Sequence, residues 1–278
     1  MLKQRLITAG VLVSLLTWSI LALPDTYLAL LLSIFIIIAA WEWAGFFRPD
    51  VLSVRLGYSA VISALLAYVW FQINTNNMLI IISIAFVWWL LIFGYLIRTT
   101  MRSNIDKGNN ARGKIIKGFA GIIVLVPAWS AMVFIHQSEQ LGPYYLIFLF
   151  VLISMADTGA YIAGKRWGTH KLAPVISPGK TWEGVFGMLL VVVITAIIGG
   201  FLLGESAKEL VFFVPFCVGV AVFSIAGDLL ESVLKRSIGK KDSGSILPGH
   251  GGMLDRIDSL TASAPVFLLG MFVLNNSF

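Results

Sequence analysis

The residues best suited to chemistry lie in one polar stretch, residues 227–258, which interrupts an otherwise apolar chain. It contains five Lys or Arg residues, the run His250-Gly251-Gly252, and the acidic residues Asp228, Glu231, Asp242, Asp255 and Asp258. Carboxylates can hold a hard divalent cation, basic side chains can bind phosphate oxygens, and glycines let backbone N–H groups approach those oxygens. We therefore predict a site that holds a cation and a polyanionic phosphate together.

Helical spacing places these carboxylates in two groups. If the preceding helix continues past residue 227, one of its faces carries Asp228, Glu231, Ser232 and Lys235. Asp255 and Asp258 stand at i and i+3 where the next apolar run begins. A carboxylate buried beside a membrane is costly unless a cation pairs with it, so both groups are predicted to belong to the site. A structural salt bridge is the alternative for either group alone.

A third group lies at the end of an apolar run, in the sequence ADTGAYIAG. Helical spacing puts Asp157, Tyr161 and Gly164 on one face. An aspartate about two turns inside a membrane helix is expected to face a polar cavity. A hydrogen bond between helices, made by a protonated Asp157, is the alternative.

The segment SPGKT, residues 177–181, follows that helix. Gly179-Lys180-Thr181 resembles the end of a P-loop, but that motif needs a glycine where Pro174 stands, and no strand is predicted before it. We therefore reject a nucleotide-triphosphatase fold. What remains is a Ser-Pro-Gly turn before a helix whose first N–H groups attract anions.

Composition sets the class of protein. The chain has 278 residues, of which 58% are hydrophobic and 12% charged, and its mean hydropathy is +0.91; soluble domains carry about 25% charged residues. It is predicted to be an all-α integral membrane protein. The lone cysteine, Cys217, excludes an intramolecular disulfide, and three scattered histidines give no zinc spacing.

Nine apolar runs are long enough to cross a bilayer. They are Leu6–Leu23, Tyr27–Phe47, Leu56–Phe71, Met78–Ile97, Gly118–Ile135, Pro143–Gly164, Val185–Leu203, Leu210–Gly227 and Ile257–Leu274. The first is expected to be a retained helix, because no convincing signal-peptide cleavage site precedes Pro24.

The basic residues test this count. With nine spans, every Lys and Arg except Lys208 falls on the same side of the membrane as the N-terminus. The positive-inside rule makes that side cytoplasmic and places the C-terminus outside. The net charge of +6 then reflects topology and attraction to anionic membrane lipids and substrate, and no nucleic-acid partner is expected.

Two regions are predicted along the chain. Residues 1–114 form the first four transmembrane helices with a cytoplasmic basic loop. Residues 115–278 form a catalytic region of helices five to nine, which carries active-site loops at 165–182 and 228–258.

The polar stretch resembles a known family. Its Ser232-x-Leu234-Lys235-Arg236, Lys241-Asp242 and Leu247-Pro248-x-His250-Gly251-Gly252-Met253-x-Asp255-Arg256-x-Asp258 are similar to the C-terminal pattern of phosphatidate cytidylyltransferases, also called CDP-diacylglycerol synthases. ADTGAY and SPGKTWEG resemble the bacterial branch. The likeness in motifs covers Asp157 to Asp258, and the N-terminal spans resemble the family in hydropathy alone.

The resemblance implies a reaction and its residues. CTP and phosphatidate would give CDP-diacylglycerol and pyrophosphate with Mg²⁺, a second cation being left open, in the bacterial cytoplasmic (inner) membrane with the site facing the cytoplasm. A homodimer is also suggested. The implied catalytic residues are Asp228, Asp255, Asp258, Lys235 and Arg256. The implied substrate-binding residues are Ser177, Lys180, Thr181, Arg236, Lys241, His250, Gly251 and Gly252. The implied metal ligands are Asp228, Asp255, Asp258 and Asp157.

The residues suit that chemistry. A phosphatidate oxygen can attack the α-phosphorus of CTP in line with the departing pyrophosphate, while a metal ion and basic side chains offset the repulsion between two anions. No Ser or Cys nucleophile is needed. Because the lipid phosphate is already largely ionised near neutral pH, we expect no general base either.

Three other functions compete. A secondary transporter would more often place its polar groups near the midplane in broken helices, whereas these crowd at helix ends. A CDP-alcohol phosphotransferase has its own aspartate-rich pattern, with Asp-Gly followed by Ala-Arg, which the sequence lacks. A membrane lipid kinase differs in using ATP and in releasing no pyrophosphate.

Overall fold

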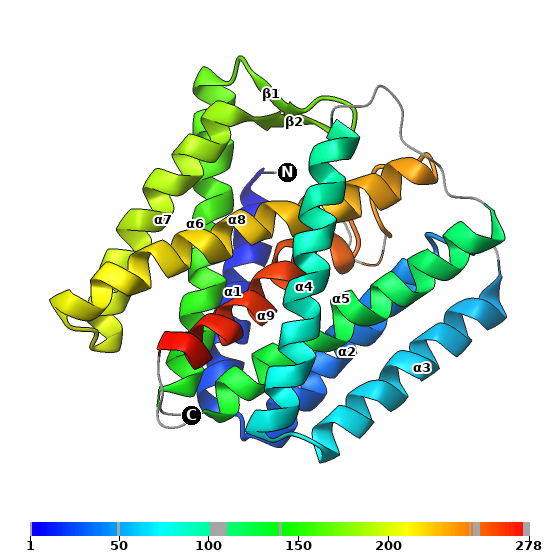
Figure 1. Ribbon diagram of the computed structural model, residues 1–278, viewed down its shortest axis with the longest axis horizontal. Coiled ribbons are helices and arrows are strands. Elements are labelled where there is room, and N and C mark those ends of the chain that lie inside the picture. Colours follow the sequence, from blue (N-terminus) through cyan, green and yellow to red (C-terminus); the bar gives the residue numbers. More distant parts are fainter. Residues whose placement is uncertain are drawn as a thin grey trace.

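Nine helices and one short hairpin make up the described part of the chain in the computed structural model (Figure 1). The structure describes residues 2–48, 51–100, 110–138, 141–244, 246 and 251–274, with the backbone alone at 2–9, 11 and 12. The helices are α1 Leu2–Ala22, α2 Asp25–Ala44, α3 Leu52–Phe71, α4 Thr75–Thr100, α5 Ala111–Gln137, α6 Gly142–Trp167, α7 Trp182–Leu203, α8 Ala207–Ser237 and α9 Leu254–Leu274. The strands are β1 Lys171–Ala173 and β2 Ser177–Thr181.

Each predicted apolar run falls on one of these helices, and the protein is an all-α integral membrane protein as predicted. Within the described residues, eight helices, α2 to α9, are long and apolar enough to cross a membrane. The first predicted span falls on α1, whose apolar part is the shorter segment Val13–Ala22. A crossing by α1 therefore stays a prediction.

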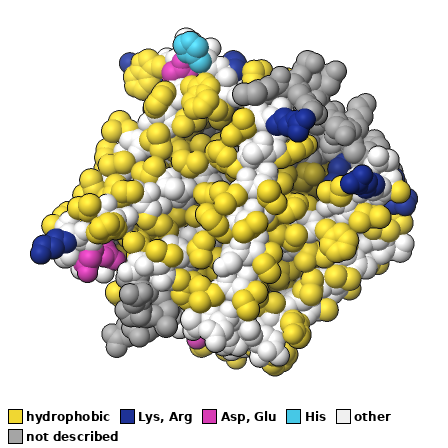
Figure 2. Space-filling view, in the orientation of Figure 1, with side chains coloured by type: hydrophobic (Ala, Val, Ile, Leu, Met, Phe, Trp, Pro, Cys, Tyr) yellow, Lys and Arg dark blue, Asp and Glu magenta, His cyan; other side chains and the backbone are white. Residues whose placement is uncertain are grey.

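Hydrophobic side chains cover most of the visible surface, and Lys and Arg lie at its edges (Figure 2). Many large apolar residues of the protein are more than half exposed, among them Leu91, Phe186, Leu190 and Phe212. In water such a surface would be costly, whereas lipid tails solvate it. The outside of the bundle is thus built to face the hydrocarbon core of a membrane.

Helices α6 and α7 pack closely because small residues line their contact. A Cβ added at Gly159 would lie 2.8 Å from the Gly187 carbonyl oxygen, and one added at Gly187 would overlap the Ala163 side chain. Small residues let membrane helices approach until their backbones touch. This pair of helices carries the hairpin between them and so fixes where the hairpin lies.

The hairpin differs from what the sequence predicts. Strands β1 and β2 pair antiparallel, with Lys171 opposite Thr181 and Ala173 opposite Ser177. The expected Ser-Pro-Gly turn is wrong, because these residues lie within β2 and the turn is at residues 174–176. Pro174 suits that turn because its ring fixes φ in the range that turns require. A short strand therefore does precede α7, although no larger sheet surrounds it in the described chain.

The bundle has two ends, which we call the hairpin end and the opposite end. The hairpin end holds β1, β2, the last turn of α8 and the start of α9; there Arg236 Nε donates to Ile176 O at 3.4 Å. The opposite end holds residues 20–25, 136–142 and 204–206; there His136 Nδ1 lies 2.8 Å from Asp25 Oδ1. In Figure 1 the hairpin lies at the top and α9 ends toward the bottom.

Candidate active site

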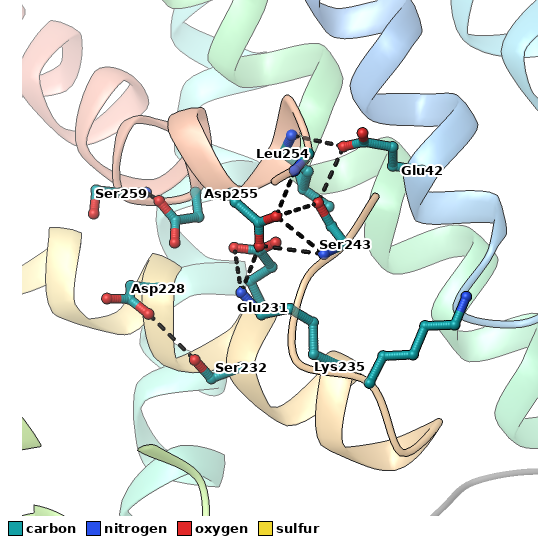
Figure 3. A network of polar contacts seen from close by, with 12 residues as sticks. Glu42, Asp228, Glu231, Ser232, Lys235, Ser243, Leu254, Asp255 and Ser259 are labelled. Atoms are coloured by element: carbon teal, nitrogen blue, oxygen red, sulfur yellow. Dashed lines mark hydrogen bonds and ion pairs between the residues drawn. The ribbon is translucent and has the colours of Figure 1, made fainter. Parts of the chain in front are cut away.

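Helix α8 carries the first acidic group into the hairpin end. It runs without interruption to Ser237, so the predicted continuation past residue 227 is confirmed. Ser232 Oγ donates to Asp228 Oδ1 at 3.2 Å, and Lys235 Nζ lies 3.4 Å from Glu231 Oε2 (Figure 3). These four side chains lie along one face of the helix, as i, i+3, i+4 and i+7 spacing requires.

Asp255 lies in the first turn of α9 and accepts hydrogen bonds from two directions. Lys235 Nζ donates to Oδ1 at 2.7 Å, and on the other side Gly252 N donates to Oδ2 at 2.8 Å. Ser243 adds its N–H at 3.0 Å and its hydroxyl at 2.9 Å, both to Oδ2. Lys235 therefore joins α8 to α9, while the loop between these helices holds Asp255 in place (Figure 3).

The hairpin brings a second lysine to the same junction. Lys180 Nζ lies 2.7 Å from Asp228 Oδ2, and both side chains are partly exposed. Asp258 comes from α9, where its carbonyl oxygen lies directly against Gly227 of α8. The acidic groups at 228–231 and 255–258 therefore meet where α8 packs against α9.

Glu231 differs from its neighbours in this cluster. Its side chain is 2% exposed, and among the described residues neither of its carboxylate oxygens has a hydrogen-bond donor. Lys235, at 3.4 Å, is closer to Asp255 than to Glu231. A buried carboxylate in this position is costly. The sequence placed Glu231 on the correct helix face but did not single it out as a site residue; its i+3 spacing from Asp228 is the feature that could have done so.

The donor set fits a divalent cation in its chemistry. Carboxylate oxygens are the ligands that Mg²⁺ prefers, and Glu231 offers two buried oxygens that accept no hydrogen bond from the described residues. Yet no three His, Cys, Asp or Glu side chains of the described chain are arranged around one point as metal ligands. Instead, Asp228 forms an ion pair with Lys180, and Asp255 forms one with Lys235. The roles of Asp228, Asp255 and Asp258 as ligands stay predictions.

Three further basic residues surround this junction. Arg236 joins the end of α8 to the hairpin through Ile176 O and also donates from Nη1 to Lys240 O at 3.3 Å. Lys241, in the loop that follows, and Arg256, in the first turn of α9, are both exposed. All three lie at the hairpin end, where a soluble anion could reach them. Their contacts with substrate stay predictions.

The glycines before α9 let the side chains of Asp255 and Ser243 lie close to the backbone. Gly251 has φ +83°, a conformation that side chains disfavour, and a Cβ there would lie 2.9 Å from Asp255 Oδ2. A Cβ at Gly252 would overlap the Ser243 hydroxyl. His250 lies outside the described residues.

Two predicted phosphate-binding residues of the hairpin lie in different surroundings. Thr181 is buried and is the N-cap of α7, since its Oγ1 accepts a hydrogen bond from Gly184 N at 3.1 Å. Ser177 is half-buried at the start of β2. The Thr181 hydroxyl therefore has a structural contact, and phosphate binding by either residue stays a prediction.

Asp157 lies on α6 within electrostatic range of Lys180 and Asp228. Its side chain is exposed in the protein, although it belongs to a helix long and apolar enough to cross a membrane. The side chain therefore extends the acidic cluster along α6, and its role as a metal ligand stays a prediction.

Besides Glu231, sequence reasoning missed a residue that contacts the site from a distant helix. Glu42, on α2, is 3% exposed and accepts a hydrogen bond from Leu254 N at 2.8 Å (Figure 3). An acidic residue inside the second apolar run was the available indication. The partner, more than 200 residues along the chain, could not be read from any local pattern.

The fold and this junction define a class of protein. Carboxylates and lysines gathered at one end of a bundle of membrane helices are suited to binding phosphate groups and to offsetting the charge that develops when they react. The protein is therefore a multi-pass membrane enzyme of the kind that acts on phosphate compounds.

Comparisons with known proteins give the family. The model of the Cytidylyltransferase family matches residues 3–274. A phosphatidate cytidylyltransferase of Pseudomonas aeruginosa is 38% identical over 267 residues, 96% of each chain. One of Haemophilus influenzae is 32% identical over 284 residues, 96% of this chain and 97% of the relative. The chain belongs to the cytidylyltransferase family and is a nucleotidyltransferase. Such enzymes generally use a divalent cation.

Proposed function

We propose that this protein is a phosphatidate cytidylyltransferase, which joins CTP and phosphatidate to give CDP-diacylglycerol and pyrophosphate. The observation that carries the proposal is the junction where Lys180 of the hairpin meets Asp228 of α8 and Lys235 meets Asp255 of α9. Two near-full-length relatives bear this enzyme name. A lipid kinase, a CDP-alcohol phosphotransferase and a transporter are not favoured by either finding.

The chain's own residues have a clear part in this reaction. An oxygen of the lipid phosphate forms a bond to the α-phosphorus of CTP, and the bond from that phosphorus to the bridging oxygen breaks as pyrophosphate leaves with the electron pair. Lys180 and Lys235 can offset the repulsion between the two anions. No protein nucleophile is required. The carboxylates orient the lysines, and the closely packed helices hold both in place.

Asp228, Asp255 and Asp258 are the residues that would hold a divalent cation, with Asp157 at the edge of the cluster and Glu231 buried beneath it. We assign the cation as Mg²⁺, because hard carboxylate oxygens are its usual protein ligands; the number of acidic groups also accommodates a second cation. When bound, the metal supplies positive charge that neutralises phosphate oxygens.

The hairpin end is proposed to face the cytoplasm of a bacterium, with the protein in its inner membrane. The hairpin end carries Lys171, Lys180, Lys235 and Arg236, whereas Lys208 lies at the opposite end, which is the distribution of a positive-inside protein. CTP would arrive from water and phosphatidate from the bilayer. The two-region division at 114/115 and a homodimer stay predictions.

One assay tests this proposal. Purified protein in lipid nanodiscs is given phosphatidate, Mg²⁺ and CTP labelled at its α-phosphate, with EDTA as the metal-free control. We expect labelled CDP-diacylglycerol and an equal amount of pyrophosphate, both lost with EDTA. A kinase would instead transfer the γ-phosphate of ATP, and a transporter would form no labelled lipid; either result would overturn the proposal.

A further inference from the structure

Glu42 connects the N-terminal helices to the candidate active site. It lies in the last turn of α2, and its carboxylate reaches the loop between α8 and α9. Leu254 N donates to Oε2 at 2.8 Å and Met253 N donates to Oε1 at 3.1 Å. Ser243 Oγ lies 3.1 Å from Oε2. Three donors from one loop and one helix start therefore meet at a single buried carboxylate.

These contacts satisfy a need of α9. The first N–H groups of a helix have no partner within the helix, and the positive end of the helix dipole favours an anion there. Caps of this kind normally come from a residue next to the helix. Here the cap comes from α2, so the start of α9 is tied to an element far away in the sequence.

Ser243 extends the connection to Asp255. Its hydroxyl lies 2.9 Å from Asp255 Oδ2 as well as 3.1 Å from Glu42 Oε2. One hydroxyl proton serves these two carboxylates, and the Ser243 N–H donates to Asp255 at the same time. The position of Glu42 therefore bears on the position of Asp255 through a single residue.

The glycines of this loop make room for Glu42. A Cβ at Gly244 would overlap Glu42 Oε1, and a Cβ at Gly252 would lie 2.6 Å from Oε2. Any larger residue would push the carboxylate away from the start of α9. Part of the glycine content of the loop is thus explained by contact with α2.

The end of α2 is itself held firmly. Trp43 Nε1 donates to Lys117 O at 2.8 Å, and Lys117 Nζ donates to Phe46 O at 3.3 Å and to Ser237 Oγ at 3.0 Å. Trp43 and Phe46 belong to α2 and the turn after it, and Lys117 belongs to α5. Ser237 is the last residue of α8. Glu42 is therefore attached to a fixed base, whereas the loop that it contacts has no regular structure at residues 239–244.

We propose that Glu42 is a positioning residue for the reaction: it fixes Ser243, Met253 and Leu254 so that Asp255 is held where it can act with Lys235. This inference rests on the proposed function. Glu42 does not line the junction of Lys180 and Asp228 and acts through Ser243 and the first turn of α9. Loss of its charge should therefore impair turnover more than substrate binding.

The decisive variant is Glu42→Gln, which keeps the size of the side chain but replaces one acceptor oxygen by a donor. We expect kcat to fall about 10- to 100-fold, because small misplacements of catalytic groups have effects of this size, with KM for CTP and phosphatidate changing less than about threefold. Amide hydrogen exchange at Ser243, Met253 and Leu254, measured without substrate or metal, should become faster. Ser243→Ala, which removes one of the connections, should show the same pattern with a smaller loss.

Glu209→Gln is the matched control. Glu209 also caps a helix start, accepting from Ser206 N at 2.6 Å, but it lies at the opposite end. Glu209→Gln should leave kcat within about twofold of the wild type, and amide exchange at Ser243, Met253 and Leu254 should be unchanged. If Glu42→Gln lowered only the amount of folded protein, with kcat of the folded fraction and loop exchange like those of the wild type, the positioning role would be overturned. If Glu42→Gln fails to fold, Ser243→Ala takes its place: a normal kcat and normal amide exchange in that variant would also overturn the positioning role.

The outcome separates this inference from the proposed function. If wild-type protein formed no labelled CDP-diacylglycerol, the proposed function would fail. The exchange measurement would still report whether Glu42 holds the loop. If the wild type is active and Glu42→Gln is equally active, the positioning role alone fails.

Discussion

The two ends of the helix bundle pair their charges in different ways. At the opposite end, His136 is buried and both of its ring nitrogens have partners, Asp25 Oδ1 and Ile20 O, each at 2.8 Å. Partial burial raises the pKa of Glu205, while the Tyr145 hydroxyl donates to its carboxylate and works against that rise. These groups tie helix ends together, and each acidic side chain has a donor of its own.

The hairpin end is arranged otherwise. Asp228, Glu231 and Asp255 share two lysines, and Glu231 is buried without a hydrogen bond to either oxygen among the described residues. A protein under selection for stability alone would gain by neutralising or replacing such a group. Carboxylates in excess of their partners indicate a site kept ready for a positively charged ligand. The comparison thus separates charges that stabilise the bundle from charges that serve a reaction.

Removing a carboxylate from the hairpin end should have the largest effect. Asp228→Asn and Asp255→Asn are each expected to lower kcat by about 1000-fold or more, since each removes charge that orients a lysine and suits a cation. The labelled-CTP assay measures this, and gel filtration with thermal unfolding shows whether the variants insert and fold. Near-normal activity in both would remove the metal-site assignment.

The lysine on the hairpin is expected to come next. Lys180→Gln leaves Asp228 without its 2.7 Å partner and should lower kcat about 100-fold, the size typical for loss of one group that stabilises developing charge. Lys171→Gln, on the neighbouring strand with an exposed side chain, is the control and should stay close to wild type. Equal losses in the two variants would show that the hairpin's net charge matters and the ion pair does not.

Glu231 gives the sharpest test of the contrast between the ends. Glu231→Gln keeps the size of the side chain and relieves the crowding of acidic groups around it, so the metal-free protein should gain up to about 3 kcal/mol in free energy of unfolding. Activity should fall about 10- to 100-fold, as for other groups that support a metal site. Thermal unfolding with and without Mg²⁺ provides the measurement, and the stabilisation by Mg²⁺ should be smaller than in wild type. A variant that is both less stable and fully active would contradict this account of Glu231.

A substitution at the opposite end should lower stability and leave activity almost unchanged. His136→Gln loses contacts to Asp25 and Ile20 and should cost about 1–2 kcal/mol of stability, seen as a lower midpoint of thermal unfolding in detergent. The folded variant should keep kcat within about twofold. A loss of turnover that exceeds the loss of folded protein would show that the two ends are coupled.

The smallest effect is expected at Lys208, which among the described Lys and Arg residues is the one at the opposite end. It is exposed in the first turn of α8. Lys208→Gln should change neither kcat nor KM by more than about twofold, as the labelled-CTP assay can measure. A large effect would call the assignment of the site to the hairpin end into question.

Local patterns in the sequence were enough for much of the fold. Apolar runs located the nine helices of the described chain, and the face of α8 that carries Asp228 and Lys235 followed from helical spacing once the helix was taken to continue. The hairpin was missed because its two strands are only three and five residues long, too short for a period of two to be recognised. The resemblance in the motifs identified the family, which the comparisons confirm.

What the sequence determined by itself is therefore the membrane class, the helices, the distribution of basic residues and the family, because each depends on residues close together in the chain or on composition. Only the tertiary structure decided that Lys180 lies on Asp228, that Glu231 is buried without a hydrogen bond, and that Glu42 reaches the start of α9. These contacts join helices far apart in the chain. They depend on how small residues let those helices approach and on which side chains then face each other, and no local period encodes that.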